Sequence, residues 1–181
     1  HEKITPGSLE NKFGISVNET LEIFNYTKEF SSLSITAIAF HIGSNIKDLS
    51  PFKNSFEVAK NLIDKIQLNY NSLQTIDVGG GISPEERNFS FKDYYDMLIS
   101  YFDKERFNFI FEPGRLIAAD AGILLSKVLY TKISEGKKFI IIDAGMNDMM
   151  RPALYDAEHE ILTSKLNDSD HNIETEIVGP I

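Results

Sequence analysis

The sequence has no cysteine among its 181 residues. This absence excludes a disulfide scaffold, a thiolate metal site and a cysteine nucleophile within the chain, and it fits a reducing compartment without requiring one. There is also no basic-then-apolar leader at His1 and no apolar run that approaches the length of a membrane-spanning helix. We therefore expect neither a signal peptide nor a membrane span. Composition alone leaves the compartment open, and a cytoplasmic protein is our prediction.

Basic residues are in the minority. The chain has 18 Lys and Arg against 27 Asp and Glu, a formal net charge of −9. It offers no basic face that could neutralise a phosphate backbone or anionic lipid, so nucleic acid and membrane surfaces are excluded as expected partners. With 42% hydrophobic residues, the chain is long enough to bury a core.

Three β-rich stretches, separated by amphipathic helical stretches, occupy the first part of the chain. Strands are expected at Ile35–Phe40, Ile76–Val78 and Phe107–Phe111, which recur at the interval of a βα unit. Short, largely apolar strands that alternate with helices indicate a parallel sheet buried on both faces, as in a doubly wound sheet or a (β/α) barrel. A polar or glycine-containing turn follows each strand, and three such turns in succession favour the barrel.

The intervening helices have start signals and an apolar face. One helix is expected over Val17–Phe30. The next should have Ser50 as N-cap and Pro51 at its first helical position, and Ser90 should open a third. The side chains expected to face the sheet are Phe56, Ala59, Leu62, Ile63 and Ile66 in the second helix and Phe91, Tyr94, Tyr95, Leu98 and Phe102 in the third.

The pattern changes after Arg115. The β-rich stretches Ile123–Ile133 and Phe139–Asp143 are joined by the turn Ser134–Lys137, with no covering helix of usable length. This indicates antiparallel structure and a second domain that begins near residue 120. The acidic, polar tract Asn167–Asn172 is expected to be an exposed loop. Because the chain starts without Met and ends on an apolar strand-like run, we expect it to continue at both ends.

Three glycines, Gly79, Gly80 and Gly81, follow the second expected strand. Residues without Cβ let the backbone approach an anion and could point successive N–H groups at one phosphate, although a flexible strand-to-helix loop is the plainer alternative. Arg115 lies in the turn after the next strand. Loops after neighbouring late strands often hold a phosphate in barrels, so the combination favours phosphate binding.

Glu112 and Arg115 flank Pro113 and Gly114 in that turn. The two charged residues could form an internal ion pair that stiffens the turn, which would stabilise it by only about 0–1 kcal/mol if exposed. Alternatively they have separate tasks: Glu112 could hold a proton on a heteroaromatic nitrogen, while Arg115 clamps a phosphate or carboxylate with two N–H groups.

His41 ends the first expected strand, close to Ser44. Its ring could lie against a planar ligand while the Ser44 hydroxyl reaches an anion, although a lone histidine is more often only a strand-end residue. No second histidine stands at ligand spacing, so no metal site is predicted. Asp143, Asn147 and Asp148 surround a glycine-containing turn but lack the register of a calcium loop, and we interpret them as turn and cap residues.

Arg151 and Tyr155 are four residues apart and would share a face if their segment is helical. A planar cation beside a hydroxyl could receive a carboxylate. The alternative is a solvated arginine that lies over an interface tyrosine.

Four segments, taken in order, resemble the diaminopimelate decarboxylase family, and the resemblance runs over nearly the whole chain. They are Phe40–Ser44, Asp77–Gly81, Phe111–Arg115 and Met146–Asp156, and the segment Thr5–Gly14 is similar too. The first three are similar to the wider ornithine and diaminopimelate decarboxylase group, and the fourth points to the diaminopimelate branch. The chain departs from the pattern at Asn45, where Gln is usual, and at Glu158, where Trp is common.

The resemblance implies a fold and an activity. Residues 1–119 would be the C-terminal portion of an alanine-racemase-type (β/α)8 barrel that binds pyridoxal 5′-phosphate, and residues 120–181 would begin a β-rich C-terminal domain. The whole protein would decarboxylate meso-diaminopimelate to L-lysine and carbon dioxide, the last step of lysine biosynthesis, as a homodimer with its active site at the interface. The Schiff-base lysine would lie upstream of His1, so the chain alone should be inactive. Alternatives are a decarboxylase of ornithine or arginine and a non-catalytic homologue that binds a partner.

The resemblance also implies roles for individual residues. His41 would stack on the pyridine ring and Glu112 would pair with the pyridinium nitrogen, as the two catalytic residues. Arg151 and Tyr155 would grip the substrate carboxylate that does not react, and Arg115 would serve either a substrate carboxylate or the cofactor phosphate. The cofactor phosphate would be held by Ser44, Gly79, Gly80 and Gly81, and Gly114 and Arg115 are further expected cofactor-binding residues.

Overall fold

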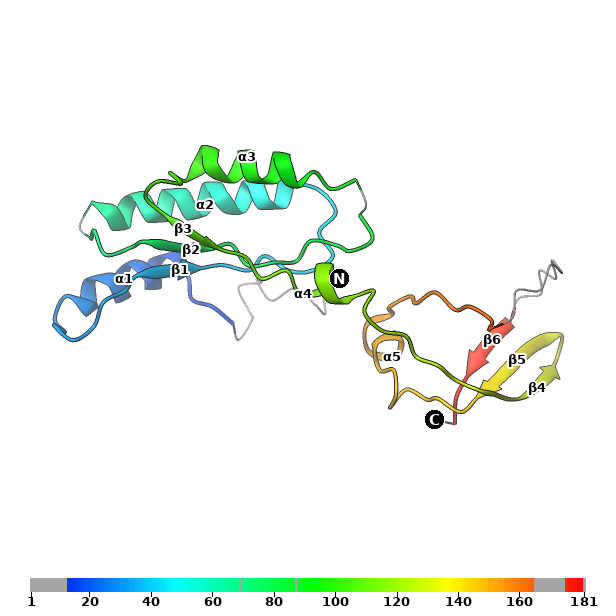
Figure 1. Cartoon of the computed structure of the whole chain (residues 1–181). Coiled ribbons are helices and arrows are strands. Elements are labelled where there is room, and N and C mark those ends of the chain that lie inside the picture. Colours follow the sequence, from blue (N-terminus) through cyan, green and yellow to red (C-terminus); the bar gives the residue numbers. More distant parts are fainter. Residues whose placement is uncertain (1–12, 69, 87, 165–174, 181) are drawn as a thin grey trace. The chain divides into compact units, whose positions relative to one another are not determined.

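The structure, a computed structural model, describes residues 13–68, 70–86, 88–164 and 175–180. The loop expected at Asn167–Asn172 and most of the segment Thr5–Gly14 lie outside these ranges. The chain divides into two compact units, Glu2–Gly122 and Ile123–Ile181 (Figure 1). Among the described residues, no helix is both long and apolar enough to cross a membrane.

The first unit contains a parallel sheet of three short strands in the order β1-β2-β3. The strands are β1 (Ala37–Ala39), β2 (Thr75–Asp77) and β3 (Asn108–Ile110). Each lies within or beside a predicted stretch but is only three residues long. The parallel pairing and the βα spacing predicted from the sequence are therefore confirmed.

The described residues of this unit form four helices: α1 (Val17–Thr27), α2 (Ser50–Gln67), α3 (Phe91–Tyr101) and α4 (Gly114–Ala118). The long helices α2 and α3 cover one face of the sheet (Figure 1). Ser16 and Glu19 form a capping box at the start of α1. Ser90 caps α3 as predicted, because its hydroxyl accepts a hydrogen bond from the N–H of Asp93 at 3.2 Å.

The predicted start of α2 is wrong by one residue. Leu49 is the N-cap, and Ser50 and Pro51 are the first two residues of the helix. Asp48 takes over the role of the cap, since its carboxylate accepts hydrogen bonds from the Ser50 hydroxyl and from the Ser50 N–H, the latter at 2.8 Å. These bonds lower the pKa of Asp48, the hydroxyl contributing most.

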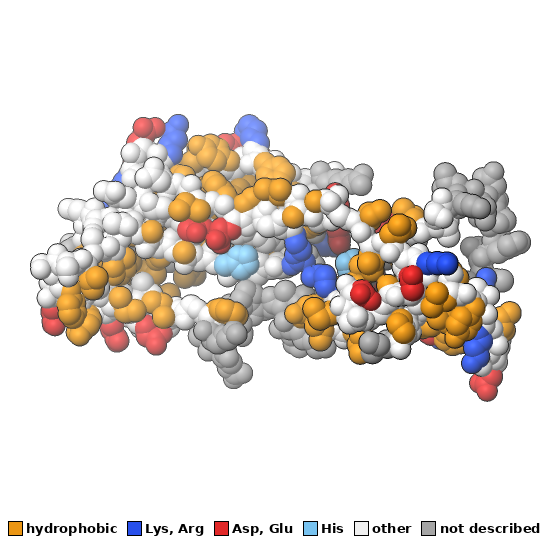
Figure 2. Space-filling model, turned by 60° about the horizontal axis from the view of Figure 1, so that its bottom comes forward, with side chains coloured by type: hydrophobic (Ala, Val, Ile, Leu, Met, Phe, Trp, Pro, Cys, Tyr) orange, Lys and Arg blue, Asp and Glu red, His pale blue; other side chains and the backbone are white. Residues whose placement is uncertain are grey.

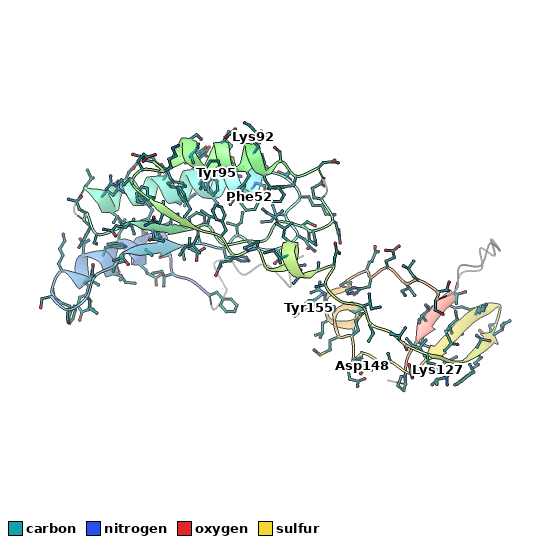
Figure 3. The ribbon with its side chains drawn as sticks, viewed as in Figure 1. Phe52, Lys92, Tyr95, Lys127, Asp148 and Tyr155 are labelled. Atoms are coloured by element: carbon teal, nitrogen blue, oxygen red, sulfur yellow. The ribbon has the colours of Figure 1, made fainter. Side chains whose placement is uncertain are left out.

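The core lies between the sheet and α2 and α3. Ile76, at the centre of β2, is fully buried between its neighbours Ile38 and Phe109, which pack against the same cluster. Figure 3 shows Phe52 among the helices of this unit, whereas Lys92 points outward. All five inward positions predicted for α2 are buried, namely Phe56, Ala59, Leu62, Ile63 and Ile66.

The inward stripe of α3 is narrower than predicted. Tyr94, Leu98 and Phe102 are buried, but Phe91 is 54% exposed and Tyr95 is 45% exposed. Positions four residues apart stay on one helix face, whereas Tyr95 is turned by about 100° from Tyr94. Phe91 lies in the first turn, where it contacts the ring of Phe89.

The described residues cover one face of the sheet and leave the other face exposed. The sequence had predicted that both faces are buried. Ala37 and Ala39 of β1 are exposed, and Ile110 of β3 is 46% exposed. These residues alternate with the buried positions along each strand, so they share the face opposite the helices.

The second unit contains the strands β4 (Val128–Ser134), β5 (Lys137–Ile142) and β6 (Thr175–Val178) and the short helix α5 (Arg151–Tyr155). As predicted, β4 and β5 pair antiparallel. Glu135 and Gly136 join them with φ values of 51° and 84°, the conformation of a hairpin turn whose twist matches its strands. However, β6 pairs parallel with β5, so the sheet is mixed rather than purely antiparallel.

Candidate functional site

The candidate site lies at the edge of the first sheet where β1, β2 and β3 end. Because the strands are parallel neighbours, the segments that leave this edge lie side by side. Backbone hydrogen bonds join them: the N–H of Glu112 donates to the carbonyl of Gly79 at 2.8 Å, and the N–H of Ile46 donates to the carbonyl of Gly81 at 2.9 Å. The three predicted segments, which begin with His41, Gly79 and Glu112, are therefore brought together.

Close packing explains the glycines of the second segment. A Cβ on Gly80 would lie 2.0 Å from the carbonyl oxygen of Glu112, and one on Gly81 would lie 2.1 Å from that of Gly43. Gly79 and Gly81 also have φ values of 67° and 98°, which side chains disfavour. The segment thus passes between the other two with no space for side chains.

Two of the three glycine N–H groups bind the protein itself. The N–H of Gly79 donates to the carboxylate of Asp77 at 2.9 Å, and the N–H of Gly80 donates to Nδ1 of His41 at 3.3 Å. Only the N–H of Gly81 donates to no group among the described residues. The structure therefore leaves one amide of this segment for an anion instead of three.

His41 is exposed at this edge, and Ser44 is half-buried three residues later. Because Nδ1 of His41 accepts the hydrogen bond from Gly80, the proton of the neutral ring is on Nε2 in this arrangement. The contact also holds the ring against the glycine segment.

Glu112 and Arg115 do not form the internal ion pair that was one of the two alternatives. Among the described residues, Nη1 of Arg115 donates instead to the side-chain oxygen of Asn45 at 2.7 Å. Arg115 lies half-buried in the first turn of α4, and Glu112 is exposed. The two charges are thus available for separate tasks.

The groups at this edge fit a ligand that combines an anion with a protonated ring nitrogen. Arg115 and the free N–H of Gly81 are donors for an anion. The carboxylate of Glu112 is an acceptor for a cationic N–H, and His41 offers a flat ring. This set of donors and acceptors matches pyridoxal phosphate.

The second unit carries the other two predicted site residues. Arg151 and Tyr155 begin and end α5, and the guanidinium carbon of Arg151 lies 5.9 Å from the centre of the Tyr155 ring. They therefore share one face of the helix, as their spacing predicted. Both residues are half-buried, and Figure 3 marks Tyr155 at the end of α5.

The acidic residues near the turn after β5 have structural partners. The carboxylate of Asp143 accepts hydrogen bonds from the Ser126 hydroxyl at 2.6 Å and the Lys127 N–H at 2.8 Å. Asp148 accepts one from the N–H of Gly145 at 2.8 Å. Asp143 and Asp148 therefore bind groups of the protein itself, which agrees with their interpretation as turn and cap residues. Among the described residues there is no cluster of three potential metal ligands.

Sequence reasoning missed two residues of the first site. Asp77 fixes the N–H of Gly79, and its position directly before the glycines, where an Asx side chain can bond the backbone two residues on, was an available signal. Asn45 contacts Arg115, but these residues are 70 positions apart, so no local pattern could have linked them.

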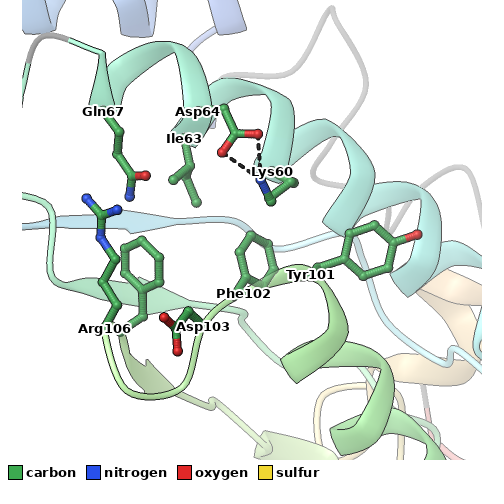
Figure 4. A pocket seen from close by; sticks show the side chains of 9 residues that line it. Lys60, Ile63, Asp64, Gln67, Tyr101, Phe102, Asp103 and Arg106 are labelled. Carbon is green, nitrogen blue, oxygen red and sulfur yellow. Dashed lines mark hydrogen bonds and ion pairs between the residues drawn. The ribbon is translucent and has the colours of Figure 1, made fainter.

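A shallow pocket of about 290 Å3 lies elsewhere in the first unit (Figure 4). It is formed where α2 and α3 end, before β3 begins, and therefore at the opposite end of the sheet from the candidate site. Gln67 has a buried Nε2 atom with no hydrogen-bond partner among the described residues. The pocket is lined by Lys60, Ile63, Asp64, Gln67, Tyr101, Phe102, Asp103, Arg106 and Phe107.

The chain is similar to known decarboxylases. It is 38% identical to a diaminopimelate decarboxylase of Zymomonas mobilis and 37% identical to one of Helicobacter pylori; each match covers 100% of this chain and 44% or 45% of the relative. A crystal structure of the Helicobacter pylori enzyme complexed with L-lysine matches with a TM-score of 0.87 and 35% identity, over 100% of this chain and 45% of that chain. The chain thus spans a little under half the length of these relatives.

A more distant structure shares the fold. The arginine decarboxylase of Paramecium bursaria Chlorella virus, bound to agmatine, is 19% identical with a TM-score of 0.83, over 99% of this chain and 49% of that chain. Residues 1–119 match the family described as pyridoxal-dependent decarboxylase, pyridoxal binding domain. This match covers the three segments of the candidate site and indicates pyridoxal phosphate as the cofactor. The chain belongs to the pyridoxal-dependent decarboxylase family.

Proposed function

We propose that the protein containing this chain decarboxylates meso-diaminopimelate to L-lysine and carbon dioxide with pyridoxal phosphate. The observation that carries the proposal is the meeting of His41, Glu112 and Arg115 with the glycine segment at one sheet edge. Relatives that are 34–38% identical over the whole chain and are named diaminopimelate decarboxylases support the substrate.

In this proposal each group at the sheet edge has one task. When bound, the cofactor supplies an electron-accepting ring for the charge that loss of carbon dioxide leaves on the substrate. His41 lies against that ring, and Glu112 keeps a proton on the ring nitrogen. The phosphate is held by the Gly81 N–H, the Ser44 hydroxyl and the glycine backbone around them; Arg115 binds either this phosphate or a substrate carboxylate.

Arg151 and Tyr155 would determine the substrate. A guanidinium beside a hydroxyl suits the second carboxylate of diaminopimelate. Ornithine and arginine end in a cation, which would leave the half-buried guanidinium of Arg151 without an anionic partner and would place a second positive charge beside it. The contact between Arg151 and the ring of Tyr155 supports this task because it keeps the guanidinium and the phenol on the same face of α5.

The same proposal includes the wider architecture. Residues 1–119 would be part of a (β/α)8 barrel, since a parallel sheet with helices on one face is what a segment of such a barrel contains. Residues 120–181 would begin a β-rich domain. The protein would be a cytoplasmic homodimer with the active site at the interface, and its Schiff-base lysine would lie outside these 181 residues.

The test uses the protein extended at both ends, purified with pyridoxal phosphate. Carbon dioxide release is measured from meso-diaminopimelate, ornithine and arginine, for the wild type and for Arg151→Ala. We expect release from diaminopimelate alone and a loss of about 100-fold in kcat/KM in the variant, since a charged hydrogen-bonded contact contributes about 1.5–3 kcal/mol.

Other outcomes would contradict specific parts of the proposal. Release from ornithine or arginine would overturn the substrate but not the cofactor. Bound cofactor without any release would indicate a non-catalytic homologue. Lys127→Ala is the matched control, because it removes an exposed cation of the same unit whose described contact is made by its backbone N–H.

A further inference from the structure

The contact between Asn45 and Arg115 joins the first strand-end segment to the third. Nη1 of Arg115 donates to the side-chain oxygen of Asn45 at 2.7 Å, a good charged hydrogen bond. Arg115 is half-buried at the start of α4, so its guanidinium is held between this helix and Asn45.

The backbone of Asn45 is fixed by its surroundings. Asn45 has a φ of 61°, a left-handed conformation that asparagine tolerates better than most residues. The next residue, Ile46, donates its N–H to the Gly81 carbonyl at 2.9 Å and accepts from the Ser83 N–H at 2.9 Å. The backbone of Asn45 is therefore held next to the glycine segment, and its side chain contacts Arg115 from this fixed position.

The chemistry of the partner is as important as its position. An amide oxygen orients a guanidinium but leaves its positive charge in full, whereas a carboxylate would neutralise it. The nearby cation Lys47 differs in this respect, because its Nζ forms an ion pair with the Glu85 carboxylate at 3.4 Å. Among the described residues, no acidic side chain forms an ion pair with Arg115.

We propose that Asn45 is a positioning residue that orients the Arg115 guanidinium toward an anionic group of the ligand without neutralising its charge. The inference rests on the proposed function, because the anion is either the cofactor phosphate or a substrate carboxylate. Both present oxygens with the same chemistry to Arg115, and the experiment separates them.

The experiment uses the extended protein and two substitutions at this position. Asn45→Gly removes the amide and accepts the left-handed backbone, and Asn45→Asp keeps an oxygen there but adds a negative charge. We expect Asn45→Gly to weaken binding of the anion by about threefold to tenfold, because the guanidinium of Arg115 is no longer oriented. Asn45→Asp should weaken it by about tenfold or more, because its carboxylate also neutralises Arg115 and repels the anion. Lys47→Ala, which removes an exposed ion pair from the same loop, should change binding less than twofold.

Two titrations identify the anion. If Arg115 holds the phosphate, the Kd of pyridoxal phosphate rises in the Asn45 variants while that of pyridoxal, which lacks the phosphate, does not. If Arg115 holds a substrate carboxylate, cofactor binding is unchanged and the KM for diaminopimelate rises with little change in kcat. Either pattern supports the inference; unchanged constants in both variants overturn it.

A double-mutant cycle separates positioning from a merely structural role. In an Arg115→Gln background, Asn45→Gly should have no further effect on Kd or KM, because the group on which it acts is gone. An equal effect in both backgrounds overturns the inference, even if both variants are less stable. Wild-type protein that neither binds pyridoxal phosphate nor releases carbon dioxide would instead defeat the proposed function itself.

Discussion

The two units of the chain differ in how they bury apolar side chains. In the first unit, α2 and α3 cover one face of the sheet, and every described hydrophobic side chain that is less than a tenth exposed lies between Phe24 and Phe107. In the second unit, none of the described residues is buried to that degree, and Tyr130 of β4 is 60% exposed. Figure 2 shows apolar side chains at the surface of this unit.

This difference has a simple origin in the elements. The 18-residue helix α2 buries six apolar side chains, whereas α5 has only five residues in all. A three-stranded sheet needs a covering layer to bury its apolar face. The first unit therefore carries its own core, whereas none of the described residues of the second unit is buried.

The largest expected effect comes from removing the centre of the core. Phe56 is fully buried and contacts the rings of Phe40, Phe52, Tyr94, Tyr101 and Phe102. Phe56→Ala should lower the free energy of unfolding by about 3–5 kcal/mol, because it removes buried apolar surface and leaves a cavity. Urea unfolding followed by helical circular dichroism measures this, since α1, α2 and α3 all lie in the first unit.

The matched substitution in the second unit is Tyr130→Ala. Its expected cost in the 181-residue chain is within about 0.5 kcal/mol, because the side chain is largely in water. Amide hydrogen exchange of β4 and β5 measures the change in the local stability of this hairpin. A cost similar to that of Phe56→Ala would mean that the second unit has a core of its own, and the comparison between the units would fail.

A second comparison uses two glycines with equally close neighbours. A Cβ on Gly80 would lie 2.0 Å from the carbonyl oxygen of Glu112, and one on Gly179 would lie 2.0 Å from that of Ala144. Gly80→Ala should cost about 1–3 kcal/mol and weaken pyridoxal phosphate binding, because the segments on both sides of Gly80 are tied to strands of a packed sheet. Gly179→Ala should cost less, because its neighbours Ala144 and Gly145 belong to a unit in which none of the described residues is buried.

Gly122→Ala is the control for this pair. Gly122 has nothing within 4 Å of its added Cβ, so the variant should unfold like the wild type. Thermal melts and cofactor titration of the three variants give the ranking. If Gly80→Ala and Gly179→Ala lowered the free energy of unfolding equally, the backbone around the two glycines would be equally hard to displace, and the comparison between the units would fail.

The sequence predicted the elements of the first unit better than their edges. Apolar spacing located α2 and five of its six buried positions, because a helix face repeats regularly along the chain; only Phe52 in the first turn was missed. The start of α2 was misplaced because the Ser50 hydroxyl donates to the carboxylate of Asp48 instead of accepting a hydrogen bond from the helix backbone as a cap. In the second unit, the hairpin was predictable from its turn, but the parallel pairing of β6 with β5 depends on residues more than 30 positions apart.

The site was predictable as a set of residues but not as a set of contacts. Residues at the ends of parallel strands must meet, so the approach of His41, Gly80 and Glu112 followed from the pattern. The partner of Arg115 did not: local spacing suggested Glu112, three positions away, whereas the structure places Asn45 there. The partner of Arg115 is determined by packing between segments 70 residues apart, and a local sequence pattern does not contain that information.

The units should also differ in the pH at which they lose stability. Burial raises the pKa of Tyr94 in the first unit to about 12, from an ordinary value of 10.0. Because the folded pKa lies above the unfolded one, the stabilisation is complete below pH 10 and is lost as the pH rises toward 12, by up to about 2 kcal/mol. Tyr94→Phe should abolish this loss in helical circular dichroism between pH 10 and 12. An identical alkaline loss in Tyr94→Phe would contradict the assignment.

The smallest effect is expected at acid pH in the second unit. The Ser126 hydroxyl, and then the Lys127 N–H, lower the pKa of Asp143 below its ordinary value of 3.8. Because the folded pKa is the lower one, the carboxylate stabilises the unit above pH 3.8 and loses this contribution as the pH falls through the folded pKa. Asp143→Asn keeps a side-chain oxygen for both donors but removes the titration. Hydrogen exchange of the amides near Lys127 should therefore accelerate in acid relative to pH 6 in the wild type but not in the variant, after correction for intrinsic exchange. Equal acceleration in both would mean that this carboxylate does not anchor the start of β4.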